Sequence, residues 1–290
     1  MSIAIVTDST ADLTDEIIGA RPITVVPCYT NVDGRSCLDG IELTRAEFYR
    51  QLPFYRVAPT TSAPNAEAFA TLFSRLVAQG VASIVCICVP DSLSNTCNAA
   101  RMAARNVPEA SVTVLDSGQL SLGIGHIVLA AGDAALAGAG VSEIIALAQA
   151  MRRRSFSFGV VATLEYLQRS GRLSWAQASL GSLLRIKPLL HIHEGVIEVE
   201  KPRTMSKAIE RMLTLVSGLG ALERISLIHT HAGQTQLDEM RRLIGPFLPA
   251  RIAPLTVEAT PALGVHLGPG VVALCCVQEA DLPWPANKSA

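Results

Sequence analysis

The run of residues that decides the fold opens the chain and reads Ile3-Ala4-Ile5-Val6-Thr7-Asp8-Ser9-Thr10-Ala11-Asp12. Its first half, residues 3–7, carries no charge and is rich in β-branched side chains, which predicts a strand buried on both faces. Its second half, residues 8–12, is small and polar, which predicts a loop where that strand ends. An apolar run followed by a polar cluster returns at residues 83–96 and 112–118. The repetition predicts parallel strands whose loops gather at one edge of a sheet.

Helical patterns stand between these strands. Thr44-Arg45-Ala46-Glu47 reads as a capping box. After Pro64, apolar side chains recur with helical spacing over residues 69–76, and residues 94–106 and 142–154 fit two further helices. Strands that alternate with helices favour a parallel sheet covered on both faces. We therefore expect an α/β protein with a parallel α/β/α domain at its N-terminal end.

The pattern changes near residue 155. Arg152-Arg153-Arg154 close a helix, where positive charge suits the helix dipole, and Ser155 to Ser157 follow. Beyond them we expect strands at 158–162, 224–229, 251–258 and 271–277, helices within 164–184 and at 206–216 and 234–244, and a hairpin over 189–199 that turns at Glu194-Gly195. The sequence thus predicts two domains, with residues 1–155 forming the α/β domain and residues 156–290 an α+β domain.

Composition narrows the classes of function. The 290 residues are 49% hydrophobic and carry a formal net charge of -1, so a large core is available and no overall field recruits nucleic acid or an anionic membrane. The chain enters a strand directly after Met1 without a signal-peptide pattern, and we expect a cytoplasmic protein. The apolar stretch from Ser117 to Gly140 is interrupted by Asp133 and Gly138, so we expect a buried helix there and no membrane span.

No metal site is expected from the cysteines and histidines. The seven cysteines form an odd set, mostly within apolar runs, which is typical of reduced core residues. Cys86-Ile87-Cys88 lies in a strand-like run. The pairs His191/His193 and His229/His231 would each place two imidazoles on one face of a strand, but no further ligand stands at a matching position.

Polar clusters follow the three predicted strands and precede one helix. They are Asp8 to Asp12, Asp91 to Thr96, Asp116 to Gly118 and Thr60 to Pro64. Hydroxyl groups beside the free amides of helix N-termini can bind an anion, which favours a carboxylate or phosphate site. The other interpretation is that these residues only cap helices, as Ser, Thr and Asp do in most proteins. The clusters by themselves leave both interpretations open.

A set of short motifs shared with a known protein family extends along almost the whole chain. Seven motifs occur in order: Thr7-Asp8-Ser9-Thr10-Ala11-Asp12-Leu13; Thr61-Ser62-Ala63-Pro64; Leu93-Ser94-Asn95-Thr96; Leu115-Asp116-Ser117 leading to Ser121-Leu122-Gly123-Ile124-Gly125; Leu164-Glu165-Tyr166-Leu167-Gln168-Arg169-Ser170-Gly171-Arg172-Leu173-Ser174; Ile186-Lys187-Pro188-Leu189-Leu190; and His266-Leu267-Gly268-Pro269-Gly270. Together they resemble the DegV family of fatty-acid-binding proteins. Each motif is short, but seven in this order over residues 7–270 are specific.

The resemblance implies a ligand and a site. It implies a two-domain fold with a long-chain fatty acid between the domains, its carboxylate held by Thr61 and Ser94. Ser62, Asn95 and His266 would complete the carboxylate site, with Asn95 in place of the glycine that the family has after the binding serine. The resemblance implies a non-catalytic carrier whose only ligand is the fatty acid, with no further cofactor.

The resemblance also implies a partner. In bacteria that have a fatty-acid kinase, family members present the acyl group to the kinase, which makes an acyl phosphate from ATP. Arg172 and Arg203 would contact the kinase or its phosphate, and transient membrane contact would allow lipid exchange. Two other functions stay open. One is a small-molecule transferase or hydrolase that uses the Asp8, Ser94 and Asp116 loops, and the other is a lipid sensor that needs no kinase.

Overall fold

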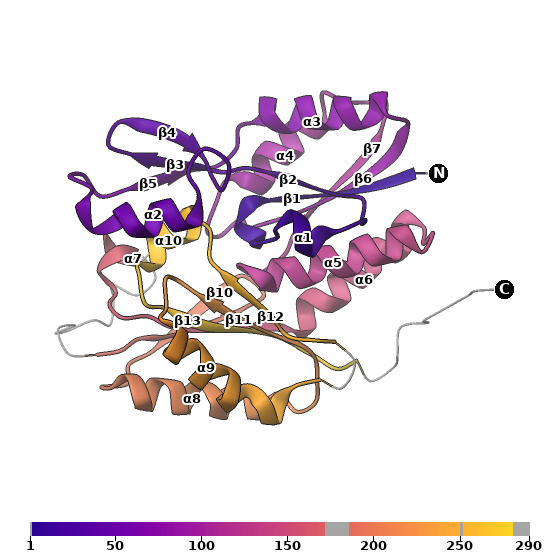
Figure 1. Ribbon diagram of the computed structural model, residues 1–290. Coiled ribbons are helices and arrows are strands. Elements are labelled where there is room, and N and C mark those ends of the chain that lie inside the picture. The colour runs from indigo at the N-terminus through magenta and orange to yellow at the C-terminus, as the bar shows by residue number, and fades with distance from the viewer. Residues whose placement is uncertain (1, 172–185, 250–251, 281–290) are drawn as a thin grey trace.

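The structure is a computed structural model that describes residues 2–171, 186–249 and 252–280. Its first sheet has the strand order β2-β1-β6-β7, and all its strands are parallel (Figure 1). The strands are β1 (Ser2–Asp8), β2 (Ile23–Val26), β6 (Val81–Cys88) and β7 (Ser111–Asp116). The three predicted strands are confirmed. Strand β2 was not predicted, although its run Ile-Thr-Val-Val is β-branched.

Helices cover both faces of this sheet. They are α3 (Ala66–Ala78) and α4 (Thr96–Ala104) on one face, and α5 (Leu122–Leu136) and α6 (Val141–Arg154) on the other (Figure 1). Phe69 and Phe73 of α3 are fully buried and pack in one apolar cluster with Ile84 of β6. The apolar spacing after Pro64 therefore faces the sheet, and the expected parallel α/β/α arrangement is confirmed.

A second sheet, with the order β10-β9-β8-β13-β11-β12, follows the first along the chain. Its strands are β8 (Ser155–Val160), β9 (Leu189–His193), β10 (Val196–Glu200), β11 (Leu222–His229), β12 (Leu255–Glu258) and β13 (Val272–Gln278), and its outer face is covered by α8 (Met205–Gly218) and α9 (Gln234–Ile244) (Figure 1). Neighbouring strands are antiparallel except β11 and β12. The predicted hairpin is confirmed: Glu194 and Gly195 turn with positive φ angles of 45° and 79°.

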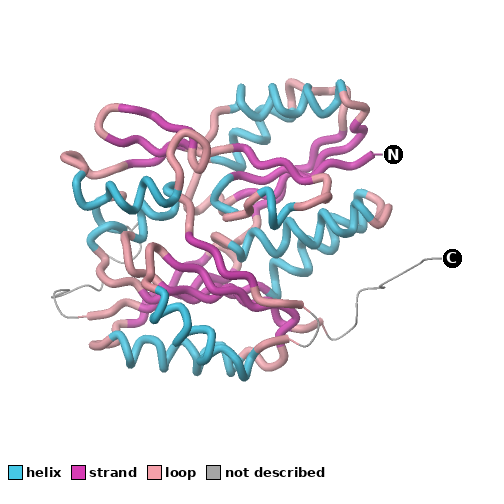
Figure 2. Tube along the Cα trace, viewed as in Figure 1, coloured by secondary structure: helices cyan, strands magenta, loops and turns pink. Residues whose placement is uncertain are grey.

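Helices α5 and α6 lie between the two sheets, so that the layers alternate helix, sheet, helix, sheet, helix (Figure 2). Ile127 of α5 shares one apolar cluster with Val85 of β6 and Cys275 of β13. Helix α5 is therefore buried on nearly every side, which confirms the buried helix predicted from residues 117–140. Within the described ranges, no helix is both long enough and apolar enough to cross a bilayer. The division of the chain into domains at residue 155 stays a prediction.

A small antiparallel sheet interrupts the first half of the chain and was not predicted. It has the order β4-β3-β5, with β3 (Tyr29–Val32), β4 (Arg35–Leu38) and β5 (Thr60–Ser62), and α2 (Arg45–Gln51) follows β4. Asp33 and Gly34 form the turn between β3 and β4 with φ angles of 44° and 80°. Asp-Gly is a strong two-residue hairpin signal, so the β3–β4 hairpin could have been predicted from the sequence. The predicted cap of α2 is present, since Thr44 Oγ1 accepts the Glu47 N–H at 3.2 Å.

Two short helices complete the region around the site. They are α7 (Glu165–Arg169) and α10 (Pro261–Leu267). The other short helices of the described residues are η1 (Ser9–Ala11), α1 (Asp15–Ile18), η2 (Leu52–Phe54) and η4 (Gly245–Phe247). Helix α10 was not predicted. It packs closely on α2 at Gly264, where a Cβ atom would come within 2.6 Å of Tyr49 Oη. The expected helical pieces over 164–184 are described only as far as α7, and residues 172–184 lie outside the described residues.

Candidate functional site

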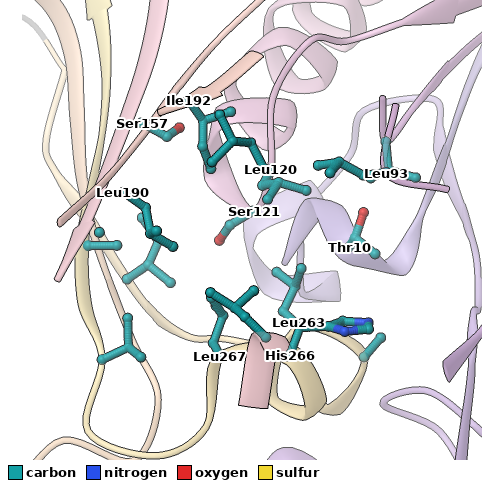
Figure 3. A pocket seen from close by; sticks show the side chains of 18 of the residues that line it. Thr10, Leu93, Leu120, Ser121, Ser157, Leu190, Ile192, Leu263, His266 and Leu267 are labelled. Atoms are coloured by element: carbon teal, nitrogen blue, oxygen red, sulfur yellow. The ribbon is translucent and has the colours of Figure 1, made fainter. Parts of the chain in front are cut away.

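One cavity is lined by both halves of the chain. The loops and strand β5 of the first half provide Thr10, Thr61, Ser62, Leu93, Ser94, Leu120 and Ser121; the second sheet provides Ser157, Phe158, Leu190, Ile192, Ile197 and Ile228; and α10 provides Ala262, Leu263, His266 and Leu267. Figure 3 shows Leu190 and Ile192 across the cavity from Leu263 and His266. Most of the wall is apolar, and hydroxyl groups and one imidazole interrupt it. Such a cavity suits a ligand with a long apolar part and a small polar group.

The predicted polar clusters meet at the carboxyl edge of the first sheet. Asp8 Oδ2 accepts the Val89 N–H at 2.9 Å, which joins the loops after β1 and β6. Asp116 Oδ2 accepts the Asp91 N–H at 2.9 Å, which joins the loops after β6 and β7. The convergence expected from the sequence is confirmed. These two carboxylates hold backbone amides and thereby brace the loops that carry Leu93 and Ser94.

Strand β5 and helix α10 place Thr61 beside His266. Thr61 Oγ1 and His266 Nε2 are 2.9 Å apart, within hydrogen-bond distance. Thr61 is held in β5 by its pairing with Thr30 of β3, and His266 lies near the end of α10. The next residue along β5, Ser62, also lines the cavity, and its hydroxyl accepts a hydrogen bond from the Asn31 amide at 3.1 Å. Thr61 and His266 therefore meet as predicted, whereas the Ser62 hydroxyl lies on the opposite face of β5 with Asn31.

Ser94 is the fourth predicted residue in the cavity wall. Its Oγ lies 2.8 Å from Thr96 Oγ1 and 3.4 Å from the Thr96 N–H. Asn95 takes the N-cap position of α4 with a φ angle of -81°, so the left-handed conformation that favours glycine is not used there. Its side chain is exposed and does not belong to the cavity wall. Replacement of the family's glycine by Asn95 thus adds no side chain to the cavity.

Two further hydroxyls in the wall are backed by buried carboxylates. Thr10 Oγ1 donates to Asp8 and Ser121 Oγ donates to Asp12. Burial raises the pKa of Asp8, although hydrogen bonds from Thr10 and Val89 oppose the shift. Burial also raises the pKa of Asp12, to about 6, although the Arg45 guanidinium 3.7 Å away opposes that shift. Sequence reasoning did not assign Thr10 or Ser121 to the site, even though both lie within motifs that it singled out.

The second sheet closes the cavity through the tip of the β9–β10 hairpin. The Gly195 N–H donates to the Gly118 carbonyl at 2.9 Å, and Ser92 Oγ donates to the Gly195 carbonyl at 2.9 Å. A Cβ atom on Gly118 would approach the Glu194 backbone to 2.9 Å, so this contact requires glycine. The hairpin thereby holds Ile192 and Ile197 over the cavity. The apolar wall from this sheet was not assigned to the site in advance.

Of the two predicted kinase contacts, Arg203 belongs to the described residues. Arg203 is exposed in the bend before α8 and does not line the cavity. Its loop is joined to the segment before β9, because the Lys187 N–H donates to the Pro202 carbonyl at 2.7 Å. Arg172 lies outside the described residues.

The four histidines of the pairs His191/His193 and His229/His231 each contact another residue of the protein. Among the described residues, no group of three or more His, Cys, Asp or Glu side chains is arranged to hold a metal ion. His193 stacks on Phe156 with the ring centroids 4.1 Å apart, and His191 lies 3.3 Å from Glu200. The expectation that His229 and His231 share a strand face is wrong, because His231 follows β11 in a left-handed conformation. All seven cysteines are buried.

Comparison with known proteins places these features in a family. The profile described as "Uncharacterised protein, DegV family" matches residues 2–279. A DegV domain-containing protein of Streptomyces coelicolor is 35% identical over 273 residues, which cover 93% of this chain and 96% of that protein.

Two solved structures are similar over nearly their whole length. A DegV family protein from Thermus thermophilus, described as fatty acid binding, is 31% identical, with a TM-score of 0.87 over 96% of this chain and 100% of that one. DegV from Bacillus subtilis, described as a fatty acid binding protein, is 30% identical, with a TM-score of 0.86 over 96% and 99% of the two chains. These matches bear out the resemblance read from the seven motifs: the chain belongs to the DegV family.

Proposed function

We propose that this protein buries a long-chain fatty acid in the cavity between its two sheets and presents the carboxyl group to an ATP-dependent fatty-acid kinase. The observation that carries the proposal is the cavity itself, in which an apolar wall is combined with the hydroxyls of Thr61 and Ser94. The Thermus and Bacillus relatives that share this fold are described as fatty-acid-binding proteins, which supports the same ligand here.

The polar contacts explain how the site would hold a carboxylate. A hydroxyl can donate only one hydrogen bond, so Thr61 can serve the ligand only when it does not donate to its neighbour. If His266 Nε2 carries a proton, it donates to Thr61 Oγ1 across their 2.9 Å separation, and the Thr61 proton is free for the carboxylate. Thr96 Oγ1 can support Ser94 in the same way across 2.8 Å. Each proposed donor is thus backed by a group that frees its proton.

The apolar wall would supply most of the affinity. Each methylene group removed from water contributes about 0.8 kcal/mol, so an acyl chain with roughly fourteen methylenes supplies about 11 kcal/mol before ordering costs. Phe158, Leu190 and Ile192 of the second sheet face this space. The hydroxyls would then decide which end of the ligand is held near α10.

A carrier accounts for the carboxylates better than an enzyme does. Asp8 accepts hydrogen bonds from two backbone amides and the Thr10 hydroxyl. Asp116 accepts the Gly118 N–H at 2.7 Å as well as the Asp91 N–H. The hydroxyl partner of Ser94 is Thr96 and no general base. A nucleophile without an adjacent base is poorly activated, so these loops offer little for the transferase or hydrolase alternative.

The kinase partner is the second part of the proposal. Arg203 is exposed and free to contact a protein or phosphate, and the same role is proposed for Arg172. In this proposal the carrier works in the cytoplasm and contacts the membrane only during lipid exchange. A lipid sensor without a kinase partner would share the cavity but would not need the arginines.

Titration and turnover together test the proposal. The purified, delipidated protein is titrated with a long-chain fatty acid by calorimetry, and the complex is then offered to a fatty-acid kinase with ATP. A carrier binds one fatty acid per chain and speeds acyl-phosphate formation above that from free fatty acid. Binding without any gain in turnover would replace the carrier by a sensor, and absence of binding would contradict both.

A further inference from the structure

Helix α10 carries several residues of the proposed head-group site. Leu263, His266 and Leu267 all line the cavity, and His266 lies beside Thr61. The helix has only seven residues, from Pro261 to Leu267. A helix of this length is not stable alone, so contacts from elsewhere must set its position.

Two buried carboxylates contact the first turn of α10. Asp12 Oδ1 accepts the Thr260 N–H at 2.7 Å, and Asp39 Oδ1 accepts the Ala262 N–H at 2.8 Å. The Asp12 side chain is 0% exposed and the Asp39 side chain 3%. Thr260 is the N-cap residue, but its own side chain makes no capping hydrogen bond. Asp12 and Asp39 therefore supply, from the far end of the chain, the acceptors that a helix N-terminus requires.

Both carboxylates are anchored in the first half of the chain. The second oxygen of Asp39 accepts a hydrogen bond from Ser9 Oγ at 2.6 Å, and Ser9 Oγ in turn accepts the Cys28 N–H at 3.0 Å. The second oxygen of Asp12 accepts from Ser121 Oγ. In each carboxylate, one oxygen is thus hydrogen-bonded to the first half of the chain and the other to the first turn of α10.

The charged and titratable groups around this pair come from several elements. Arg45 of α2 lies 3.7 Å from Asp12 and favours its ionised form. Burial raises the pKa of both aspartates, and their mutual repulsion contributes to the shift at Asp12. Tyr49 of α2 lies in the same environment and donates from Oη to the Ala259 carbonyl at 3.1 Å. Keeping two carboxylates here costs stability, which calls for a compensating role.

We propose that Asp12 and Asp39 are positioning residues of the head-group site, which hold the first turn of α10 so that His266 stays against Thr61. The inference rests on the proposed fatty-acid binding and adds to it two residues that touch no ligand. Loss of Asp12 or Asp39 should disturb the contacts to the carboxylate of the fatty acid. It should leave the apolar wall of the second sheet, which contacts the acyl chain, in place.

The test compares a long-chain fatty acid with its methyl ester, which has the same acyl chain and no carboxylate. Asp39→Ala and Asp12→Ala should weaken acid binding about tenfold, the effect of one lost hydrogen bond, and ester binding much less. Asp39→Asn and Asp12→Asn keep an acceptor for the backbone amide and should restore most of the acid affinity. The control is Thr204→Ala, which removes the Oγ1 acceptor of the Lys207 N–H from α8, a helix outside the cavity wall. It should leave both affinities unchanged.

A double-mutant cycle measures the coupling between Asp39 and His266 in acid affinity. A purely structural role of Asp39 would not produce such coupling. If Asp39 acts through His266, Asp39→Ala should add little to the loss of acid affinity in His266→Ala. Equal weakening of acid and ester, or additive effects in the cycle, would overturn the proposal. Should the alanine variants fail to fold, Ser9→Ala provides a milder test, because it removes the Ser9 hydrogen bond to Asp39 and keeps the Asp39 contact with α10. Wild-type protein that binds neither ligand would instead contradict the proposed function.

Discussion

Thr61 Oγ1 and His266 Nε2 lie 2.9 Å apart although 205 residues separate them along the chain. One comes from strand β5 in the small sheet of the first half, and the other from helix α10 near the end of the described chain. The proposed head-group site therefore depends on two segments that are far apart in the sequence. Displacement of β5 or α10 should therefore weaken binding of the carboxylate more than binding of the acyl chain.

Removal of the proposed carboxylate donors should weaken fatty-acid binding. In Thr61→Val combined with Ser94→Ala, each lost hydrogen bond to a charged group costs about 1.5–3 kcal/mol of binding free energy. Thr61→Ser keeps the hydroxyl and should be mild, and His266→Ala should be intermediate. Calorimetric titration measures the affinities. An unchanged affinity and bound pose in the double variant would remove these residues from the site.

Bound lipid should raise thermal stability. A ligand that binds only the folded state stabilises it by about 2.7 kcal/mol at a concentration one hundred times its Kd. Delipidated protein should therefore melt at a lower temperature, and reloading should restore the melting temperature. Differential scanning calorimetry of the two forms gives the comparison. Identical melting temperatures would indicate an interior that needs no ligand.

Acidic pH should stabilise the folded protein through Asp12. Its pKa is about 6 when folded, above the ordinary value of 3.8, so the folded state binds a proton more readily than the unfolded chain between these values. The free energy of unfolding should therefore fall as the pH rises from about 4 to about 6, by at most about 3 kcal/mol from this group. The raised pKa values of Asp8 and Asp39 act in the same direction. Urea denaturation at a series of pH values measures the slope.

The variant Asp12→Asn isolates this contribution. Asparagine can accept the Thr260 N–H through its oxygen and donate to Ser121 Oγ through its nitrogen, and it does not titrate. The pH slope of stability should shrink in this variant. The control is Asp238→Asn, which removes an exposed carboxylate from α9 and should keep the slope. An unchanged slope in Asp12→Asn would exclude Asp12 as its source.

Loss of Arg203 should separate lipid retention from transfer. Because the residue is exposed and outside the cavity wall, Arg203→Ala should keep its bound fatty acid. It should be a poor kinase substrate, since charge-assisted contacts act on the partner or the developing acyl phosphate. Arg203→Lys should rescue turnover only in part, because lysine lacks the planar fork. Arg241→Ala in α9, another exposed arginine, is the matched control. Proportional loss of lipid and turnover in Arg203→Ala would assign Arg203 to the lipid site or the fold.

Local sequence patterns predicted most of the fold. Residues 3–7 formed a buried parallel strand as expected, and the turn at Glu194-Gly195 closed its hairpin. These features depend on a short window of residues, where hydrophobic period and turn chemistry act directly. Helix α10 depends on distant residues: its first turn relies on Asp12 and Asp39, and Gly264 lets it pack on Tyr49. No local pattern signals such support.

The site, too, was predictable only where local sequence motifs determine it. Thr61, Ser94 and His266 could be named because each belongs to a motif that resembles the family. The wall from Leu190 and Ile192 could not be named, because an apolar strand residue that faces a cavity has the same pattern as one that faces a filled core. Only the arrangement of the two sheets distinguishes the two cases.

Native mass spectrometry of protein purified from cells without added lipid tests the central claim most directly. We predict a population that carries one extra mass equal to a single long-chain fatty acid, which is released on denaturation and identified by its chain length. A chain that is ligand-free in every preparation and takes up no fatty acid on incubation, or one that carries a ligand of another class, would contradict the account.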